Sequence, residues 1–234
     1  MRIRWRIAAF ALVVVTIGLT GVWWQFGYPL PSFAYSLAPK LELTDPPSIL
    51  TNWQLEAVTR DPQLCEKLVL RSPLVSAKRV PPKPVQSGCG WINAISLQRV
   101  GDIEVNASPI DCGAAAALIL WLEHSVQPLA KDKLSSRVQK ITHFGTYSCR
   151  NIAGTSRRSV HARAAAIDIA GFRLANGASV SLKRDWHDDD AKAAFLRDIH
   201  ETSCQSFKVS LSPEFNAAHA DHFHLDRGLF RRCK

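Results

Sequence analysis

Histidine and aspartate side chains gather in two short segments of the chain, with a spacing that could bind a metal ion. His161 precedes Asp168 by seven residues, and His222 and His224 are separated by one residue. Asp168 interrupts an apolar stretch that is typical of a strand, where the two flanking isoleucines would face the core and the carboxylate the opposite side. The same alternation places His222 and His224 on one side of a second strand.

Two histidines and one carboxylate, with a fourth position left for water, are typical of a catalytic zinc site. A zinc ion there would lower the pKa of the water and polarise a carbonyl group, while a neighbouring histidine that is not a ligand moves the proton. An unpaired carboxylate on a sheet face also needs a cation, because burying it alone is costly. Each segment alone is common, and a lone histidine is more often an ordinary surface or hydrogen-bonded residue.

The hydrophobic pattern predicts the elements that would position these residues. Apolar residues indicate a short helix over 62–68, a buried helix over 112–126 that Pro128 ends, and an amphipathic helix over 191–199. Strands are expected over residues 138–143, 166–174, 179–186 and 207–211, the middle two joined at Asn176-Gly177. The expected fold class is α+β, with an antiparallel sheet flanked by helices.

The N-terminal segment predicts a membrane anchor. Three arginines within the first six residues precede an uncharged run over 7–24 that ends in an aromatic cluster. We therefore expect one uncleaved transmembrane helix in residues 1–27, embedded in the inner membrane, with the rest of the chain in the periplasm. A cleaved signal peptide is the alternative. Residues 28–49 contain five prolines and predict a linker, followed by a domain over 50–234.

Composition and cysteine content narrow the class of protein. The chain has 47% hydrophobic and 21% charged residues, which excludes a disordered or collagen-like protein. Its six cysteines are widely spaced without a C-x-x-C pair, which predicts three disulfides in an oxidising compartment, with the pairing open and buried free thiols as the alternative. The net charge of +9 fits nucleic acid, anionic lipid or an anionic wall polymer. The charge is scattered and no aromatic-basic motif accompanies it, so we do not expect nucleic acid as a partner.

Taken together, the motifs resemble a known group of enzymes. The pattern Ser-x-His-x4-Ala-x-Asp over 159–168, followed by His-x-His over 222–224, is similar to the signature of zinc peptidases. That group includes D-Ala-D-Ala carboxypeptidases and penicillin-insensitive murein endopeptidases, with hedgehog-type domains as relatives. The segments 146–151, 167–172 and 222–226 also resemble the bacterial extensin-like C-terminal domain family, over roughly residues 55–234.

The resemblance implies a hedgehog or D-Ala-D-Ala peptidase-like fold with its core over about 110–234, and it assigns roles residue by residue. It implies zinc binding by His161, Asp168 and His224, a general base in His222, and an oxyanion-stabilising cation in Arg150, which could equally be an ordinary surface arginine. Ser159 would hold the turn of the motif, and His219 and Asp221 would line the cleft, although Asp221 could instead be an ion-pair partner. The carboxypeptidase branch has a glutamate as base just before its last zinc histidine, whereas this chain has Asp221 and His222 there, as in the endopeptidase branch.

The sequence thus predicts a membrane-anchored, exported zinc-dependent hydrolase that cleaves amide bonds in peptidoglycan peptides. The alternative is a non-catalytic, zinc-containing domain that binds the cell wall. The presence of His222 beside a complete ligand set favours the hydrolase, because a structural zinc site closes its fourth position.

Overall fold

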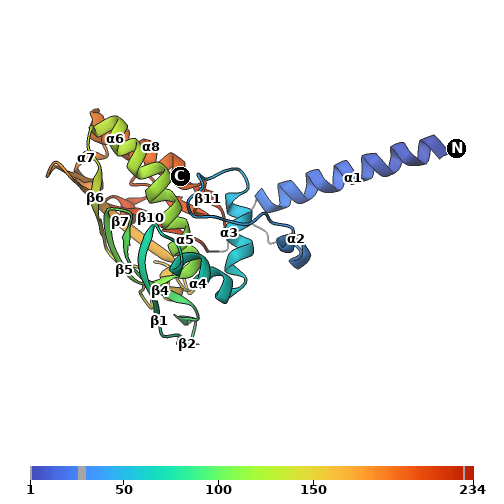
Figure 1. Cartoon of the computed structure of the whole chain (residues 1–234), viewed down its shortest axis with the longest axis horizontal. Helices are drawn as coiled ribbons and strands as arrows, with labels where there is room; N and C mark the ends of the chain where they lie inside the picture. Colours follow the sequence, from blue (N-terminus) through green and yellow to red (C-terminus); the bar gives the residue numbers. More distant parts are fainter. Residues whose placement is uncertain (1, 26–29, 229) are drawn as a thin grey trace.

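A computed structural model describes residues 2–25, 30–228 and 230–234 (Figure 1). Its helices are α1 (Arg2–Gln25), α2 (Ser32–Ser36), α3 (Thr51–Thr59), α4 (Pro62–Leu70), α5 (Cys112–Trp121), α6 (Gln127–Leu134), α7 (Leu182–Asp185) and α8 (Ala191–Ser203). A π turn, η1 (Leu122–Val126), joins α5 to α6, and 3₁₀ turns occupy η2 (Val160–Arg163) and η3 (Ala217–His219). The strands are β1 (Val75–Val80), β2 (Lys83–Gln86), β3 (Cys89–Trp91), β4 (Ala94–Val100), β5 (Ile103–Asp111), β6 (Val138–His143), β7 (Ala166–Leu174), β8 (Ser179–Ser181), β9 (Val209–Leu211), β10 (Phe223–Asp226) and β11 (Arg232–Cys233).

Within the described residues, nine of these strands form one sheet in the order β1-β4-β5-β6-β7-β10-β9-β11, with β8 paired to β7. The expected α+β class holds, but the expectation of an antiparallel sheet is wrong, because β5 and β6 run parallel, as do β9 and β11. The parallel step at β5–β6 follows from the connection, since α5, η1 and α6 carry the chain back across the sheet before β6 begins.

The core lies between the sheet and the helices that cover one face of it, among them α5, α6 and α8 (Figure 1). All residues of α5 are buried, and Asp111 caps its first turn. Trp121 at the end of α5 packs on Phe172 and Phe207 and donates a hydrogen bond from Nε1 to the Ile199 carbonyl (2.8 Å). The apolar residues of the sequence therefore define one continuous core.

Two of the expected elements end at other residues than the sequence predicted. The helix that begins at Cys112 continues to Leu134 through the π turn, in which the Gln127 amide donates a hydrogen bond to the Leu122 carbonyl. Pro128 then lies in the first turn of α6, where the absence of its N–H costs little free energy. The strand expected over 179–186 ends at Ser181, and α7 follows.

The N-terminal helix α1 is 24 residues long, but within the described part of the chain no helix meets the length and apolarity needed to cross a bilayer. The expected transmembrane helix through residues 7–24 and the single-pass location in the inner membrane are therefore wrong.

The segment expected as a linker over 28–49 also contributes to the core in its described part. It contains α2, and its Leu41 and Leu43 belong to the main hydrophobic cluster. The Leu43 carbonyl lies 3.0 Å from Nε2 of His124 in the π turn. Packing thus continues N-terminal to residue 50.

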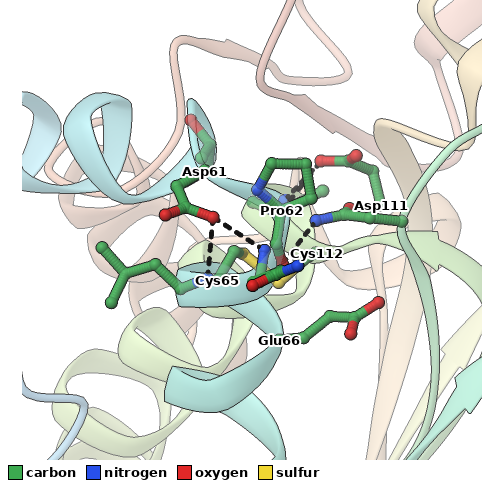
Figure 2. Close-up of a disulfide and its surroundings, with 12 residues drawn as sticks. Asp61, Pro62, Cys65, Glu66, Asp111 and Cys112 are labelled. Carbon is green, nitrogen blue, oxygen red and sulfur yellow. Dashed lines mark hydrogen bonds between the residues drawn. A yellow bond between two sulfur atoms is a disulfide. The ribbon is translucent and has the colours of Figure 1, made fainter.

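Three disulfides pair all six cysteines: Cys65–Cys112, Cys89–Cys149 and Cys204–Cys233. The first joins α4 to α5, directly between two helix starts that are capped by Asp61 and Asp111 (Figure 2). The expected oxidised state of the cysteines is confirmed.

Candidate metal centre

The candidate metal centre is built on two neighbouring antiparallel strands. β10 pairs with β7 in a register that sets His224 opposite Asp168. The residues on either side of each, Ile167 and Ile169 on β7 and Phe223 and Leu225 on β10, are fully buried in the core. Alternation along both strands therefore turns the imidazole and the carboxylate to the opposite face of the sheet, side by side.

The third candidate ligand, His161, reaches the same place from the turn η2. The Ser159 hydroxyl accepts a hydrogen bond from the His161 amide (3.3 Å) and so caps this turn. Ala164 ends it in the left-handed conformation, with φ 55°. A non-glycine residue adopts that conformation at a cost in free energy. Strand β7 starts two residues later. The tight turn brings the buried His161 back over Asp168.

Three side-chain atoms converge at the centre. Asp168 Oδ1 lies 3.1 Å from His161 Nε2 and 2.9 Å from His224 Nδ1, and the two imidazole nitrogens are 3.2 Å apart. In the part of the chain that the structure describes, these three residues form a cluster suited to a metal ion, with ligand atoms all within 4.8 Å of one another. Two imidazole nitrogens and one carboxylate oxygen are a donor set that zinc accepts.

The outer nitrogen of each imidazole is already occupied, which orients the inner one. His161 Nδ1 donates to the Thr146 carbonyl (3.1 Å), and His224 Nε2 donates to the Asp226 carboxylate (2.9 Å). Each ring then presents an unprotonated nitrogen to the centre when it is neutral, as in metal sites whose histidines are held by a carbonyl or carboxylate. The outer contacts thus select the tautomers that bind metal.

The charges at the centre reinforce one another. Burial alone would raise the pKa of Asp168, but hydrogen bonds from His161 and His224 outweigh it and hold that pKa well below its usual range. Burial likewise opposes the charged form of His224, yet hydrogen bonds to Asp168 and Asp226 raise its pKa to about 9. The centre therefore stabilises a positive charge next to the Asp168 carboxylate, and a bound cation would supply that charge.

His222 stands beside this cluster without belonging to it. Its Nδ1 donates to the Asp221 carboxylate (2.8 Å), and its Nε2 lies 3.6 Å from Asp168 Oδ1. The Phe144 ring meets the His222 ring edge-on, with centroids 5.5 Å apart. Asp221 and Phe144 hold the imidazole so that its Nε2 faces the three candidate ligands.

His219 and Arg150 lie at the rim. The His219 ring is 5.3 Å from that of His222 and 5.7 Å from that of His224, and its Nδ1 is 2.7 Å from Asn216 Oδ1. Burial and the positive charges of His224, His222 and Arg150 lower the pKa of His219 to about 4. Arg150 is exposed, and its carbonyl accepts a hydrogen bond from the Ser159 amide (3.0 Å), which places it next to the turn that carries His161.

All eight residues singled out in the sequence thus gather in one region, and three contributors were missed. Asp226 supports His224, the Thr146 carbonyl supports His161, and Phe144 packs on His222. Asp226 carried a signal, because it continues the alternation through residues 222 and 224 on the same strand. Thr146 and Phe144 carried none, since their contacts arise from the loop after β6.

Comparison with known proteins places the chain in a family. A family model described as "Extensin-like protein C-terminus" matches residues 63–234. No curated protein and no solved structure matches the chain. The matched region includes every residue of the candidate metal centre and all three disulfides. The chain therefore belongs to the family of extensin-like protein C-termini.

Proposed function

We propose that the chain is a zinc-dependent hydrolase that cleaves amide bonds in peptidoglycan peptides. The observation that carries the proposal is the convergence of His161 Nε2, Asp168 Oδ1 and His224 Nδ1, each ring turned inward by an outer hydrogen bond. Three protein ligands leave one position of a tetrahedral zinc ion for water and substrate, which is the pattern of catalytic sites.

The environment of the centre supports a catalytic role over a purely structural one. The side chains of Asp168 and His224 are each 13% exposed, so the centre is sheltered but open to a substrate. His222, which is not needed as a ligand, stands next to the cluster with its Nε2 turned towards Asp168. A closed structural site needs neither feature.

A zinc ion held there would supply a Lewis acid for the amide carbonyl and would make a water molecule more acidic. His222 Nε2 would accept the proton from the attacking water, because Nδ1 is committed to Asp221. Asp221 would stabilise the imidazolium that results, and the same Nε2 could then return the proton to the departing amine. Arg150 would supply the cation that offsets the negative charge developing on the carbonyl oxygen.

Peptidoglycan peptide is proposed as the substrate because the motif over 159–168 and the His222-x-His224 pair resemble those of zinc peptidases that act on it. The disulfides support this choice of substrate, since such bonds persist in oxidising compartments outside the cytosol.

The test begins with the metal content of the purified chain and continues with products released from isolated peptidoglycan. We expect about one zinc per chain, and new peptide products that vanish with a chelator and return when zinc is added back. His222→Gln, which keeps all three candidate ligands, serves as the inactive control. Zinc without products from the wild type would instead support the wall-binding alternative, and a chain without bound metal would refute both.

A further inference from the structure

A groove leads away from the candidate metal centre along the outer face of the sheet. It encloses about 490 Å³ and is lined by residues of β6, β7 and β8 together with Phe144 and Asp221. Both of these last two residues contact the His222 ring, so one end of the groove opens beside the centre.

The floor of the groove continues the strand that carries Asp168. Ala170 shares the outward face of β7 with Asp168, and Gly171 follows it. A side chain on Gly171 would collide with the Val180 carbonyl oxygen, so glycine lets β8 close against β7 and form the wall. Small residues on the floor leave space for an extended chain lying over β7.

The groove is positively charged. Arg173 on β7 and Lys183 and Arg184 on α7 line it, and all three are exposed. None of the three forms an ion pair with an acid in the described part of the chain. Lys140 also lines the groove, but its ammonium is paired with Glu104 at 2.8 Å. The acidic residue that lines the groove is Asp221, and its carboxylate already accepts a hydrogen bond from His222.

We propose that this groove is a substrate subsite that binds an extended acidic peptide, with carboxylates paired to Arg173, Lys183 and Arg184. The inference rests on the proposed hydrolase and specifies the chemistry of its substrate. Relative to β6, β7 has one extra residue at Ala170, so Arg173 shares the outward face with Asp168 and lies about four residue spacings from it, ~13 Å at ~3.3 Å per residue. Ser181 pairs with Gly171, so Lys183 and Arg184 follow β8 on the Asp168 side of that pair, and the acidic groups of the substrate therefore lie within about four residues of the bond that is cut.

The test measures binding rather than turnover. The probes are an N-acetylated, C-amidated hexapeptide of alanine and glycine with two glutamates at its C-terminal end, and the same peptide with two glutamines. Calorimetry with the zinc-loaded His222→Gln chain, which does not cut the probe, gives both affinities. We expect about tenfold tighter binding of the acidic peptide at low salt, and a preference that disappears near 0.5 M salt, where the Debye length is only ~4 Å.

Matched variants locate the effect in the groove. Lys183→Ala combined with Arg184→Ala should abolish the preference for the acidic peptide and leave the affinity for the glutamine peptide unchanged. Lys78→Ala, which removes an exposed cation from β1 at the other edge of the sheet, should change neither affinity. Circular dichroism checks that all variants are folded.

The outcomes separate this inference from the proposed hydrolase. Equal affinity of the wild-type groove for both peptides, or an equal loss with Lys78→Ala, would overturn the subsite whether or not the chain hydrolyses peptidoglycan. A charge preference that the Lys183 and Arg184 changes remove would establish the subsite even if no zinc-dependent product is found.

Discussion

The division of labour among the histidines follows from which nitrogen of each ring is already occupied. His161 and His224 donate from their outer nitrogens to a carbonyl and a carboxylate, whereas His222 donates to Asp221. The inner nitrogens of the first two approach Asp168 within 3.1 Å, and that of His222 stays 3.6 Å away. Three similar side chains therefore have two different roles.

This geometry predicts a split between metal binding and turnover. His161→Ala and His224→Ala each remove one of three ligand atoms and should lose bound zinc, as measured by mass spectrometry of the purified chain. His222→Gln should keep zinc at the wild-type level and lose turnover by about 10²–10⁴-fold, the usual contribution of a general base. His187→Ala, an exposed histidine outside the site, is the control. Equal loss of zinc in all three site variants would refute the split.

Asp226 provides a second prediction at this scale. One of its oxygens accepts from His224 Nε2 (2.9 Å) and the other from the Gly228 amide (2.7 Å). Asp226→Asn keeps the shape but offers one acceptor for two donors, so the His224 ring loses its fixed tautomer. We expect zinc affinity to fall by about 10–100-fold, which competition with a chromophoric chelator would measure. An unchanged affinity in a folded Asp226→Asn variant would mean that the carboxylate does not orient His224.

At the scale of elements, the sequence predicted what depends on local alternation and missed what depends on partners. The strand over 166–174 is found as expected, because its apolar residues recur every second position around Asp168. The parallel pairing of β5 with β6 could not be predicted, since it depends on the path of α5 and α6 over the sheet. The continuation of the helix past Pro128 depends on the π turn, for which the residues over 122–126 give no local signal. Asp226 lay within reach of the same alternation rule that identified His222 and His224.

The start of α5 offers a prediction on stability. Asp111 accepts hydrogen bonds from the Gly113 and Ala114 amides (2.9 and 3.4 Å) in a partly buried position next to the Cys65–Cys112 disulfide (Figure 2). Burial raises the pKa of Asp111, although those amides and the charges of Arg227 and Arg163 oppose the shift. Asp111→Ala removes the cap and should lower the free energy of unfolding by about 1 kcal/mol, whereas Asp111→Asn keeps an acceptor and should be at least as stable as the wild type at pH 7.

The raised pKa also fixes the sign of the pH dependence. The folded chain takes up the Asp111 proton at a higher pH than the unfolded chain, so acidification relieves the cost of the buried charge in the wild type. Asparagine has no such proton to gain. The advantage of Asp111→Asn over the wild type, measured as the shift in urea midpoint, should therefore shrink as the pH falls from 7 towards 5. An advantage that grows on acidification would show that the charged cap is the favoured form.

At the scale of the whole molecule, the disulfides connect the site to the rest of the domain. Cys89–Cys149 joins β3 to the loop that carries Thr146 and Arg150, across 60 residues of sequence. Cys204–Cys233 fixes the C-terminal end of the chain next to α8, across 29 residues. Both close loops around elements that support β10 and the His161 turn, so the position of the candidate ligands depends on covalent links as well as on the core.

The N-terminal limit of the folded domain gives the last prediction. The family match begins at residue 63, yet Leu43 is only 2% exposed and belongs to the main hydrophobic cluster. Leu43→Ala in the full chain leaves a cavity between the 30–49 segment and the π turn, and should lower the free energy of unfolding by about 2–4 kcal/mol in urea titrations. Leu37→Ala removes the same atoms from a side chain that is 69% exposed, and should change stability by less than about 0.5 kcal/mol. Similar small effects for both variants would mean that the segment before residue 50 only tethers the domain, whereas a large effect confined to Leu43 extends the cooperative unit beyond the family match.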